Sequence, residues 1–249
     1  MAPTRRASAG HAELCAIGID AGSSTVRTAL LAERGPRLEL CGVACQRRPE
    51  RDVQGAIDQV IDRMLRETAT LRGGVTLVTS TGEPPRADEP GHVLRATAHA
   101  RGARFLNARV RAVLDLGEQH SGAMHLGHDG DLAAVVDSFE EPTVAHLCAL
   151  LGQIRAGSPV LVTGGRATDG ALVARLALEC APLELLTHPL SAFAGAIGAA
   201  LSGLLSERAP GARMPAAACP ARLRWHLEAT GHEGQLVRSR PRVRRRSGA

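Results

Sequence analysis

The sequence predicts an α/β fold built from two similar units that face each other across a cleft. Short apolar runs of strand length alternate with longer segments whose apolar residues recur at helical spacing. This order restarts in the second half of the chain, where a shift of 95 residues places Asp20 on Asp115 and Gly22 on Gly117. Each copy carries an Asp-x-Gly at the end of its first strand, which predicts a pair of acidic turns.

The first unit has the pattern of a β-hairpin, a third strand, a helix, a fourth strand and a second helix. From Asp52 to Leu71 the apolar residues fall on one helical face, and Asp52 is well placed as the N-cap. Gly35-Pro36 and Gly73-Gly74 mark turns. We expect strands at 14–19, 26–31, 38–44 and 75–78, and helices at 52–71 and 91–105.

The second unit repeats this pattern and adds a helix rich in small residues at its end. We expect strands at 110–116, 123–126, 132–136, 160–162 and 183–186, and helices at 141–154, 168–180 and 191–205. We place the first lobe at 13–106 and the second lobe at 107–207. Residues 1–12 are expected to be disordered, and residues 208–249 to form a disordered basic tail.

The composition excludes several chemistries. All 30 basic residues are arginine, so a Walker A phosphate loop and Schiff-base catalysis, which need lysine, are absent. The tail holds ten of these arginines and two glutamates, so the rest of the chain is mildly acidic. We interpret the tail as solvated and expect no nucleic-acid partner.

Neither a membrane span nor a secretory signal is recognisable, so we expect a cytoplasmic protein without a membrane partner. The six cysteines include no Cys-x-x-Cys pair. In that compartment we expect them to be reduced and mostly buried, with Cys148 as a structural residue of the core.

The acidic turns suggest a site for phosphate groups. Gly22 lets the backbone approach a phosphate closely, and the hydroxyls of Ser23, Ser24 and Thr25 are donors beside it. Free amides at such a turn bind anions, and Gly117 holds the corresponding position in the second copy.

A carboxylate such as Asp20 or Asp115 can hold a hydrated Mg²⁺ or orient an attacking water. Gly164 and Gly165 stand between a strand and a helix, where missing side chains leave room for an adenosine and the helix start favours phosphate.

These motifs resemble those of a known superfamily. The segment 18–25, Gly-Ile-Asp-Ala-Gly-Ser-Ser-Thr, is similar to the first phosphate motif of the actin-like ATPases, and 162–165, Val-Thr-Gly-Gly, to their adenosine motif. Segments 97–103, 115–119 and 187–199 resemble the BadF/BadG/BcrA/BcrD-type ATPases, which include activators of 2-hydroxyacyl-CoA dehydratases and ATPase subunits of benzoyl-CoA reductase. The resemblance covers about 14–207. It implies a duplicated ribonuclease-H-like fold that binds ATP and Mg²⁺ between two lobes.

The sequence departs from that family at three places. The family's Asp-Ile-Gly-Gly-Gln-Asp is Asp-Leu-Gly-Glu-Gln-His at 115–120, so Glu118 stands where the backbone should approach phosphate. The family's Thr-Gly-Tyr-Gly-Arg is Thr-Gly-Glu-Pro-Pro-Arg at 81–86. The segment with the cysteines that ligate the family's shared iron–sulfur cluster is missing, so we expect no such cluster. His99 and Arg101 match the family motif and form either a solvated face or an interdomain contact.

Three functions stay open. In the first, the chain is an activator-type ATPase without its own cluster: Asp20 or Asp115 orients the water, Gln119 assists, and Arg27 or Arg86 offsets developing charge. Its partner would be an acyl-CoA dehydratase or reductase component, and the chain would form a homodimer or pair with a paralogue. In the second, the chain is a pseudo-ATPase that serves as a regulatory or partner subunit. The third is a small-molecule kinase, for which no sugar-site insertion is visible.

Overall fold

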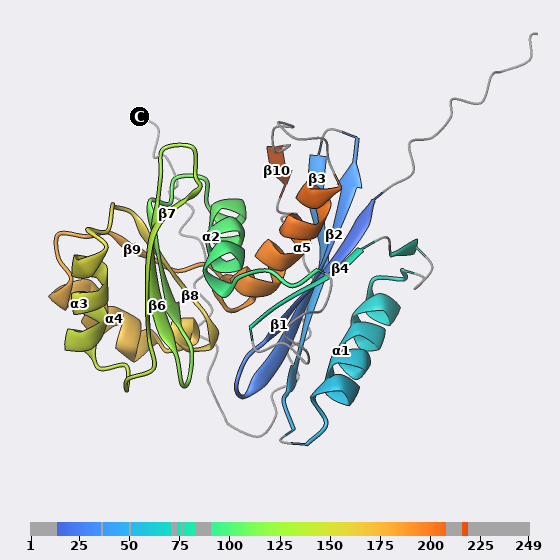
Figure 1. Cartoon of the computed structure of the whole chain (residues 1–249), viewed down its shortest axis with the longest axis horizontal. Coiled ribbons are helices and arrows are strands. Elements are labelled where there is room, and N and C mark those ends of the chain that lie inside the picture. Colours follow the sequence, from blue (N-terminus) through green and yellow to red (C-terminus); the bar gives the residue numbers. More distant parts are fainter. Residues whose placement is uncertain are drawn as a thin grey trace, which may run out of the picture.

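In the part of the chain that the structure describes, two mixed β-sheets have three α-helices outside them and two between them (Figure 1). The structure is a computed structural model. It describes residues 14–35, 37–49, 51–70, 74–75, 77–82 and 91–207, and the backbone of 216–218. The predicted disorder at 1–12, Arg86, Cys219 and most of the predicted tail lie outside these residues.

The first sheet has the strand order β10-β3-β2-β1-β4. Its strands are β1 (Cys15–Ala21), β2 (Thr25–Arg34), β3 (Arg37–Arg47), β4 (Leu77–Gly82) and β10 (Ala216–Ala218). Strands β1, β2 and β3 form an antiparallel meander, whereas β4 runs parallel to β1. Strand β10, three residues of the predicted tail, pairs in parallel with β3.

The second sheet repeats this plan in the order β7-β6-β5-β8-β9. Its strands are β5 (Ala112–Leu116), β6 (Ser121–Leu126), β7 (Leu132–Ser138), β8 (Val160–Thr163) and β9 (Leu185–Leu186). Strands β5, β6 and β7 form the meander and β8 runs parallel to β5. The strand orders β3-β2-β1-β4 and β7-β6-β5-β8 therefore share one topology, whereas the fifth strands, β10 and β9, lie at opposite edges. The sequence prediction of a duplicated α/β fold is confirmed.

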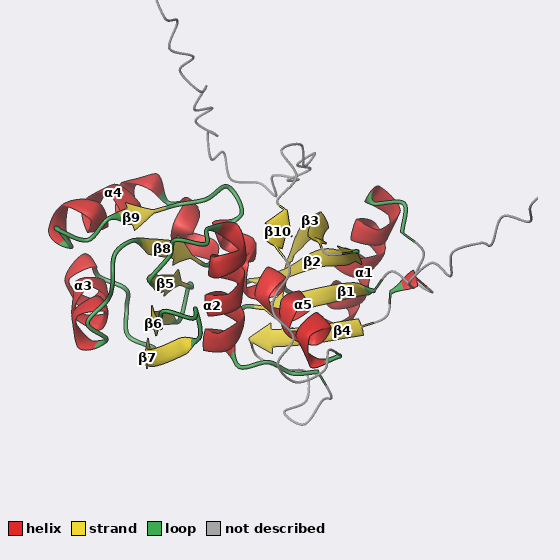
Figure 2. Ribbon diagram, turned by 90° about the horizontal axis from the view of Figure 1, so that it is seen from above, coloured by secondary structure: helices red, strands yellow, loops and turns green. Residues whose placement is uncertain are grey.

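Two helices cross between the sheets, as Figure 2 shows from above. Helix α2 (Arg95–Leu106) belongs to the first half of the chain, yet Ala100 and Ala103 pack with the apolar core of β5, β6 and β8. Helix α5 (Ala194–Ser206) belongs to the second half, and Ala196 and Ala200 pack with the core of the first sheet. Each half thus supplies a helix to the other half's sheet, which holds the two sheets together.

The outer faces of the sheets are covered by the remaining helices. Helix α1 (Val53–Glu67) packs its apolar side on the first sheet, and the Asp52 carboxylate accepts a 2.8 Å hydrogen bond from the Gly55 amide, which confirms the predicted N-cap. Helices α3 (Val144–Gln153) and α4 (Gly170–Glu179) cover the second sheet. No described helix has the length and apolar character needed to cross a membrane.

Helices α2 and α5 approach each other so closely that only glycine fits at the crossing. A Cβ atom on Gly198 would overlap the carbonyl oxygen of Ala98, and one on Gly102 would overlap that of Ala194. Gly18 on β1 has the same relation to Ala196 of α5. The small-residue motifs of the two helices therefore have a packing role, because they allow backbone to touch backbone.

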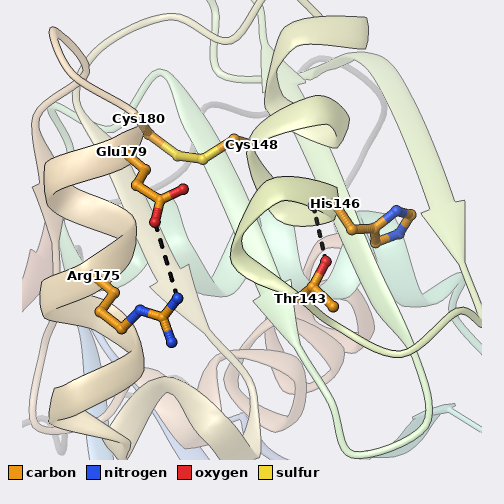
Figure 3. The surroundings of a disulfide bond; sticks show 6 residues. All are labelled: Thr143, His146, Cys148, Arg175, Glu179 and Cys180. Carbon is orange, nitrogen blue, oxygen red and sulfur yellow. Dashed lines mark hydrogen bonds and ion pairs between the residues drawn. A yellow bond between two sulfur atoms is a disulfide. The ribbon is translucent and has the colours of Figure 1, made fainter.

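The structure corrects the prediction that the cysteines are reduced. Cys148 on α3 forms a disulfide with Cys180 at the end of α4 (Figure 3). Cys148 is only half-buried, and Cys15, Cys41 and Cys45 are thiols. A cross-link between residues 32 positions apart stabilises the second lobe by about 4 kcal/mol if it acts through the entropy of the unfolded chain.

Candidate functional site

The two acidic turns have the same local structure in both halves. Asp20 is the penultimate residue of β1 and pairs with Thr81, and Asp115 is the penultimate residue of β5 and pairs with Thr163. After each aspartate the chain closes a tight turn, in which the Gly22 amide donates to the Thr25 carbonyl at 3.0 Å and the Gly117 amide donates to the His120 carbonyl at 2.8 Å. The amides of both glycines are therefore used inside their turns, and other groups of these loops must contact any anion.

His99 brings the two turns together. Its side chain is completely buried on α2, between the lobes. Its Nε2 lies 3.8 Å from Asp20 Oδ2 and its Nδ1 lies 3.4 Å from Asp115 Oδ1. The Nδ1 atom also lies 3.0 Å from the Thr163 hydroxyl. Of the two roles left open for His99, the structure therefore supports the interdomain contact, and Arg101 joins α2 to α5 by a 2.7 Å hydrogen bond to the Ser202 hydroxyl.

A cavity of about 790 Å³ opens above these aspartates, with walls from both lobes. It collects most of the residues that the sequence singled out for nucleotide binding, from three turns far apart in the chain. The predicted residues on its wall are Asp20, Gly22, Ser23, Ser24, Thr25, Arg27, Gly117, Gln119, Gly164 and Gly165.

Asp115 does not line this cavity. Its side chain is completely buried, and the Arg95 Nε donates a 2.9 Å hydrogen bond to Asp115 Oδ2. Burial alone would raise the pKa of Asp115, but the nearby charges of His99 and Arg95 and the hydrogen bond from Arg95 outweigh it and hold that pKa below its ordinary value. Asp115 is therefore a buried carboxylate with a fixed partner.

Arg95 stays charged in this position. Burial acts to lower its pKa, but the carboxylates of Asp115, Asp20 and Asp137 outweigh burial and raise the pKa above its ordinary value. Its side chain is 27% exposed and lines the cavity. Arg95 therefore presents a permanent positive charge to any ligand in the cleft.

The glycine turn of the second lobe closes the cavity opposite the first hairpin. Gly164 has a φ of 86°, and a Cβ there would lie 2.6 Å from the Leu116 carbonyl oxygen, so only glycine fits easily. Gly82 has a φ of 89° at the corresponding place in the first lobe. A Cβ on Gly165 would meet the Arg27 guanidinium at 2.7 Å, so Arg27 reaches from the first lobe to this turn.

The rim of the cavity on the second sheet has an exposed aromatic ring. His120 Nε2 lies 3.1 Å from Asp137 Oδ1, and its ring stands edge-on to Phe139 with centroids 5.2 Å apart. Phe139 is 83% exposed, which is unusual for a phenylalanine. Burial and the charge of Arg95 lower the pKa of His120 and outweigh the opposite effects of Asp115 and Asp137.

The predicted magnesium site does not fit the second turn. Mg²⁺ needs carboxylate oxygens at about 2.1 Å and keeps several waters, whereas Asp115 is sealed from the cavity and bound to Arg95. Asp20 is also buried, but it lines the cavity, and its Oδ1 has no hydrogen-bond partner in the part of the chain that the structure describes. Among those same residues, no group of three or more histidine, cysteine or acidic side chains is arranged to hold a metal.

The sequence prediction missed Arg95 as a site residue and left the place of His99 open. A signal existed, because residues four apart on a helix share one face. Arg95 and His99 have this spacing, and both point to Asp115. The charged rim residues Asp137 and Arg166 also line the cavity, and neither stands in a motif.

Comparison with solved structures places this arrangement among known folds. Component A of (R)-2-hydroxyglutaryl-CoA dehydratase from Acidaminococcus fermentans is similar with a TM-score of 0.67 and 16% identity, over 78% of this chain and 98% of that one. The activator of 2-hydroxyisocaproyl-CoA dehydratase from Clostridium difficile, solved with bound ADPNP, has a TM-score of 0.68 and 15% identity. The match covers 78% of this chain and 95% of that one. At these identities the likeness concerns the fold. The chain is a two-lobed protein with the actin-like ATPase fold.

Similarity in sequence narrows this class. Residues 17–136 match the model of the BadF/BadG/BcrA/BcrD ATPase family. The chain is 35% identical over 108 residues to a subunit of benzoyl-CoA reductase from Thauera aromatica. These residues are 43% of this chain and 38% of that protein. Within residues 17–136 the chain is thus similar in sequence to the BadF/BadG/BcrA/BcrD ATPases, and it covers well under two thirds of this curated relative.

Proposed function

We propose that this chain binds ATP in the cleft between its lobes and that the bound nucleotide sets their relative position. The observation that carries the proposal is the meeting of three turns at one cavity: the two equivalent turns after Asp20 and Asp115, and the Gly164-Gly165 turn. A cleft between two lobes is a common place for a small ligand. The relatedness to an ATPase family and the ADPNP in the Clostridium difficile activator support a nucleotide as that ligand.

Each wall of the cavity has a separate role in this proposal. The hydroxyls of Ser23, Ser24 and Thr25 and the guanidinium of Arg95 contact the phosphates. The adenosine lies against Gly164 and Gly165, where side chains are absent. Because Arg27 extends from the first lobe to Gly165, a nucleotide there contacts both lobes and stabilises their closed arrangement.

Two forms of this function remain, and the structure favours the second. In the first, the chain hydrolyses ATP with Asp20 orienting the water, Gln119 assisting and Arg27 offsetting charge. In the second, it binds ATP without turnover, as a pseudo-ATPase that regulates a partner. The complete burial of Asp115 and its bond to Arg95 favour the second form, because this carboxylate reaches neither water nor metal in the cavity.

We further propose that the partner is an acyl-CoA dehydratase or reductase component and that the chain acts as a homodimer or with a paralogue. The names of the three relatives support such a partner. In this proposal the chain has no iron–sulfur cluster of its own. The disulfide supports this in part, because Cys148 and Cys180 are joined to each other and offer no thiolate, which leaves Cys15, Cys41 and Cys45 as the thiols among the described residues.

Calorimetric titration with ATP and ADP, followed by a phosphate-release assay, tests the proposal. We expect saturable binding of ATP and no turnover above background. A Gly165→Val variant should lose binding because its side chain enters the cavity, whereas Gly170→Val, at an open exposed position outside it, should bind like the wild type. Absence of binding to the wild type would refute the function, and turnover would favour the ATPase form.

A further inference from the structure

We propose that Arg95 takes the place of a divalent cation at the second acidic turn, so that the cleft binds the phosphate chain of its nucleotide without Mg²⁺. This inference rests on the proposed nucleotide binding and specifies how that site balances the charge of its ligand. It starts from the contact between Arg95 and Asp115, which no sequence motif predicted.

Arg95 stands between Asp115 and the cavity. Asp115 is completely buried, and the 27% exposed Arg95 stands beside it on the wall of the cavity. A Cβ on Gly117 would lie 3.3 Å from Arg95 Nη2, so the guanidinium also lies next to the turn that follows Asp115. A hydrated cation entering from the cavity would meet Arg95 before it met the carboxylate.

Both carboxylate oxygens of Asp115 are covered by neighbouring groups. Oδ2 accepts the hydrogen bond from Arg95, and Oδ1 faces His99 Nδ1 at 3.4 Å. The backbone of Gly164 packs over Oδ1 so closely that a Cβ there would overlap it. Neither oxygen is therefore open to a metal or to its water shell.

The guanidinium groups of the cavity can supply positive charge to a phosphate chain. The Arg95–Asp115 contact uses only Nε, and a guanidinium has five N–H donors, so donors remain for phosphate oxygens. Arg27 and Arg166 line the same cavity, which brings three guanidinium groups to the space where the phosphates would lie. Fixed arginines can supply the positive charge that a polyphosphate otherwise takes from a cation.

The experiment compares ATP binding with EDTA and with Mg²⁺, measured by calorimetry on the full chain. For the wild type we expect dissociation constants that differ by less than about threefold between the two conditions. Arg95→Met should weaken binding in EDTA by about tenfold or more, because a charge-assisted contact to phosphate is lost. Added Mg²⁺ should restore most of that loss, since Asp115 becomes accessible.

Two further variants control the result. Arg101→Met removes an arginine of the same helix that bonds Ser202 outside the cavity, and it should behave like the wild type. Arg95→Met/Asp115→Asn removes both charges, so it avoids an unpaired buried carboxylate and should bind ATP weakly under both conditions. Thermal unfolding shows whether each variant is folded. If Arg95→Met does not fold, the comparison of wild-type ATP binding in EDTA and in Mg²⁺ still tests the inference.

The outcomes separate this inference from the function on which it rests. Binding of ATP by the wild type that weakens threefold or more in EDTA overturns the role of Arg95 and leaves nucleotide binding in place. Equal affinities of wild type and Arg95→Met in EDTA overturn it as well. Absence of binding under both conditions refutes the proposed function itself.

Discussion

At the scale of single residues, His99 is a buried polar side chain at the contact between the two lobes. It is completely buried between two carboxylates and beside the Thr163 hydroxyl. Replacing it by alanine leaves a void and two acidic groups facing each other without the ring between them. We expect His99→Ala to lower the free energy of unfolding by about 2–4 kcal/mol, measured by urea denaturation. The exposed His128 is the control, and an equal loss for His128→Ala would contradict this role of His99.

His120 should make stability depend on pH near neutrality. Its pKa is lowered in the folded protein by burial and by Arg95, so the unfolded chain binds a proton first as the pH falls below about 6.5. Its contribution to stability is therefore complete above that pH and is lost as the pH falls through the folded pKa. We expect the unfolding free energy of the wild type to fall more steeply from about pH 7 to about pH 5 than that of His120→Gln. Parallel pH profiles of the two proteins would contradict this assignment.

At the scale of elements, the crossing of α2 and α5 depends on glycine. A methyl group on Gly198 would overlap the Ala98 carbonyl, which belongs to the backbone and cannot rotate away. We expect Gly198→Ala to destabilise the protein by about 3 kcal/mol or more. Gly152 on α3 has open space at its Cβ position, so Gly152→Ala should instead stabilise by about 0.5 kcal/mol or more. Thermal unfolding of both variants measures the contrast, and losses of equal size would refute the packing argument.

The elements also show what the sequence could reveal. Within 14–207, local patterns predicted the strands and helices in the order found, with shifts of a few residues, as where the strand expected at 75–78 is Leu77–Gly82. They missed β10, because Ala216–Ala218 lies in the tail that was expected to be disordered. The duplication predicted that the turns at Asp20 and Asp115 correspond, because a repeat of one unit conserves its geometry. That inference used only spacing along the chain.

Spacing along the chain did not predict the contacts between the two halves. Arg95 reaches Asp115 only because α2 packs on the other half's sheet. The spacing of Arg95 and His99 indicates that they share one face of α2, but it does not indicate which sheet that face contacts. Cys148 and Cys180 likewise meet only because α3 and α4 cover the same face of the second sheet. The missed features are thus those fixed by tertiary packing, which single-sequence patterns do not encode.

At the scale of the whole molecule, the two halves have kept one topology and diverged at their acidic turns. Among the described residues, each aspartate has an Oδ1 without a hydrogen-bond partner, but Asp115 is completely buried and paired with Arg95, whereas Asp20 lines the cavity. The residues that follow each turn glycine differ as well: Ser23, Ser24 and Thr25 correspond to Glu118, Gln119 and His120. The first turn has the small hydroxyl side chains, and the second has the buried ion pair.

This divergence predicts that the two equivalent aspartates respond differently to the same substitution. Asp115→Asn removes the charge that pairs with the partly buried Arg95, so we expect a loss of about 3 kcal/mol of unfolding free energy. Asp20→Asn changes a carboxylate whose nearest described ion-pair partner is His99 at 3.8 Å, and we expect a change within about 1 kcal/mol. Urea denaturation of both variants under one condition measures the difference. Equal losses of unfolding free energy would mean that Asp20 and Asp115 contribute equally to stability. They would contradict the inference that the second turn has the larger structural role.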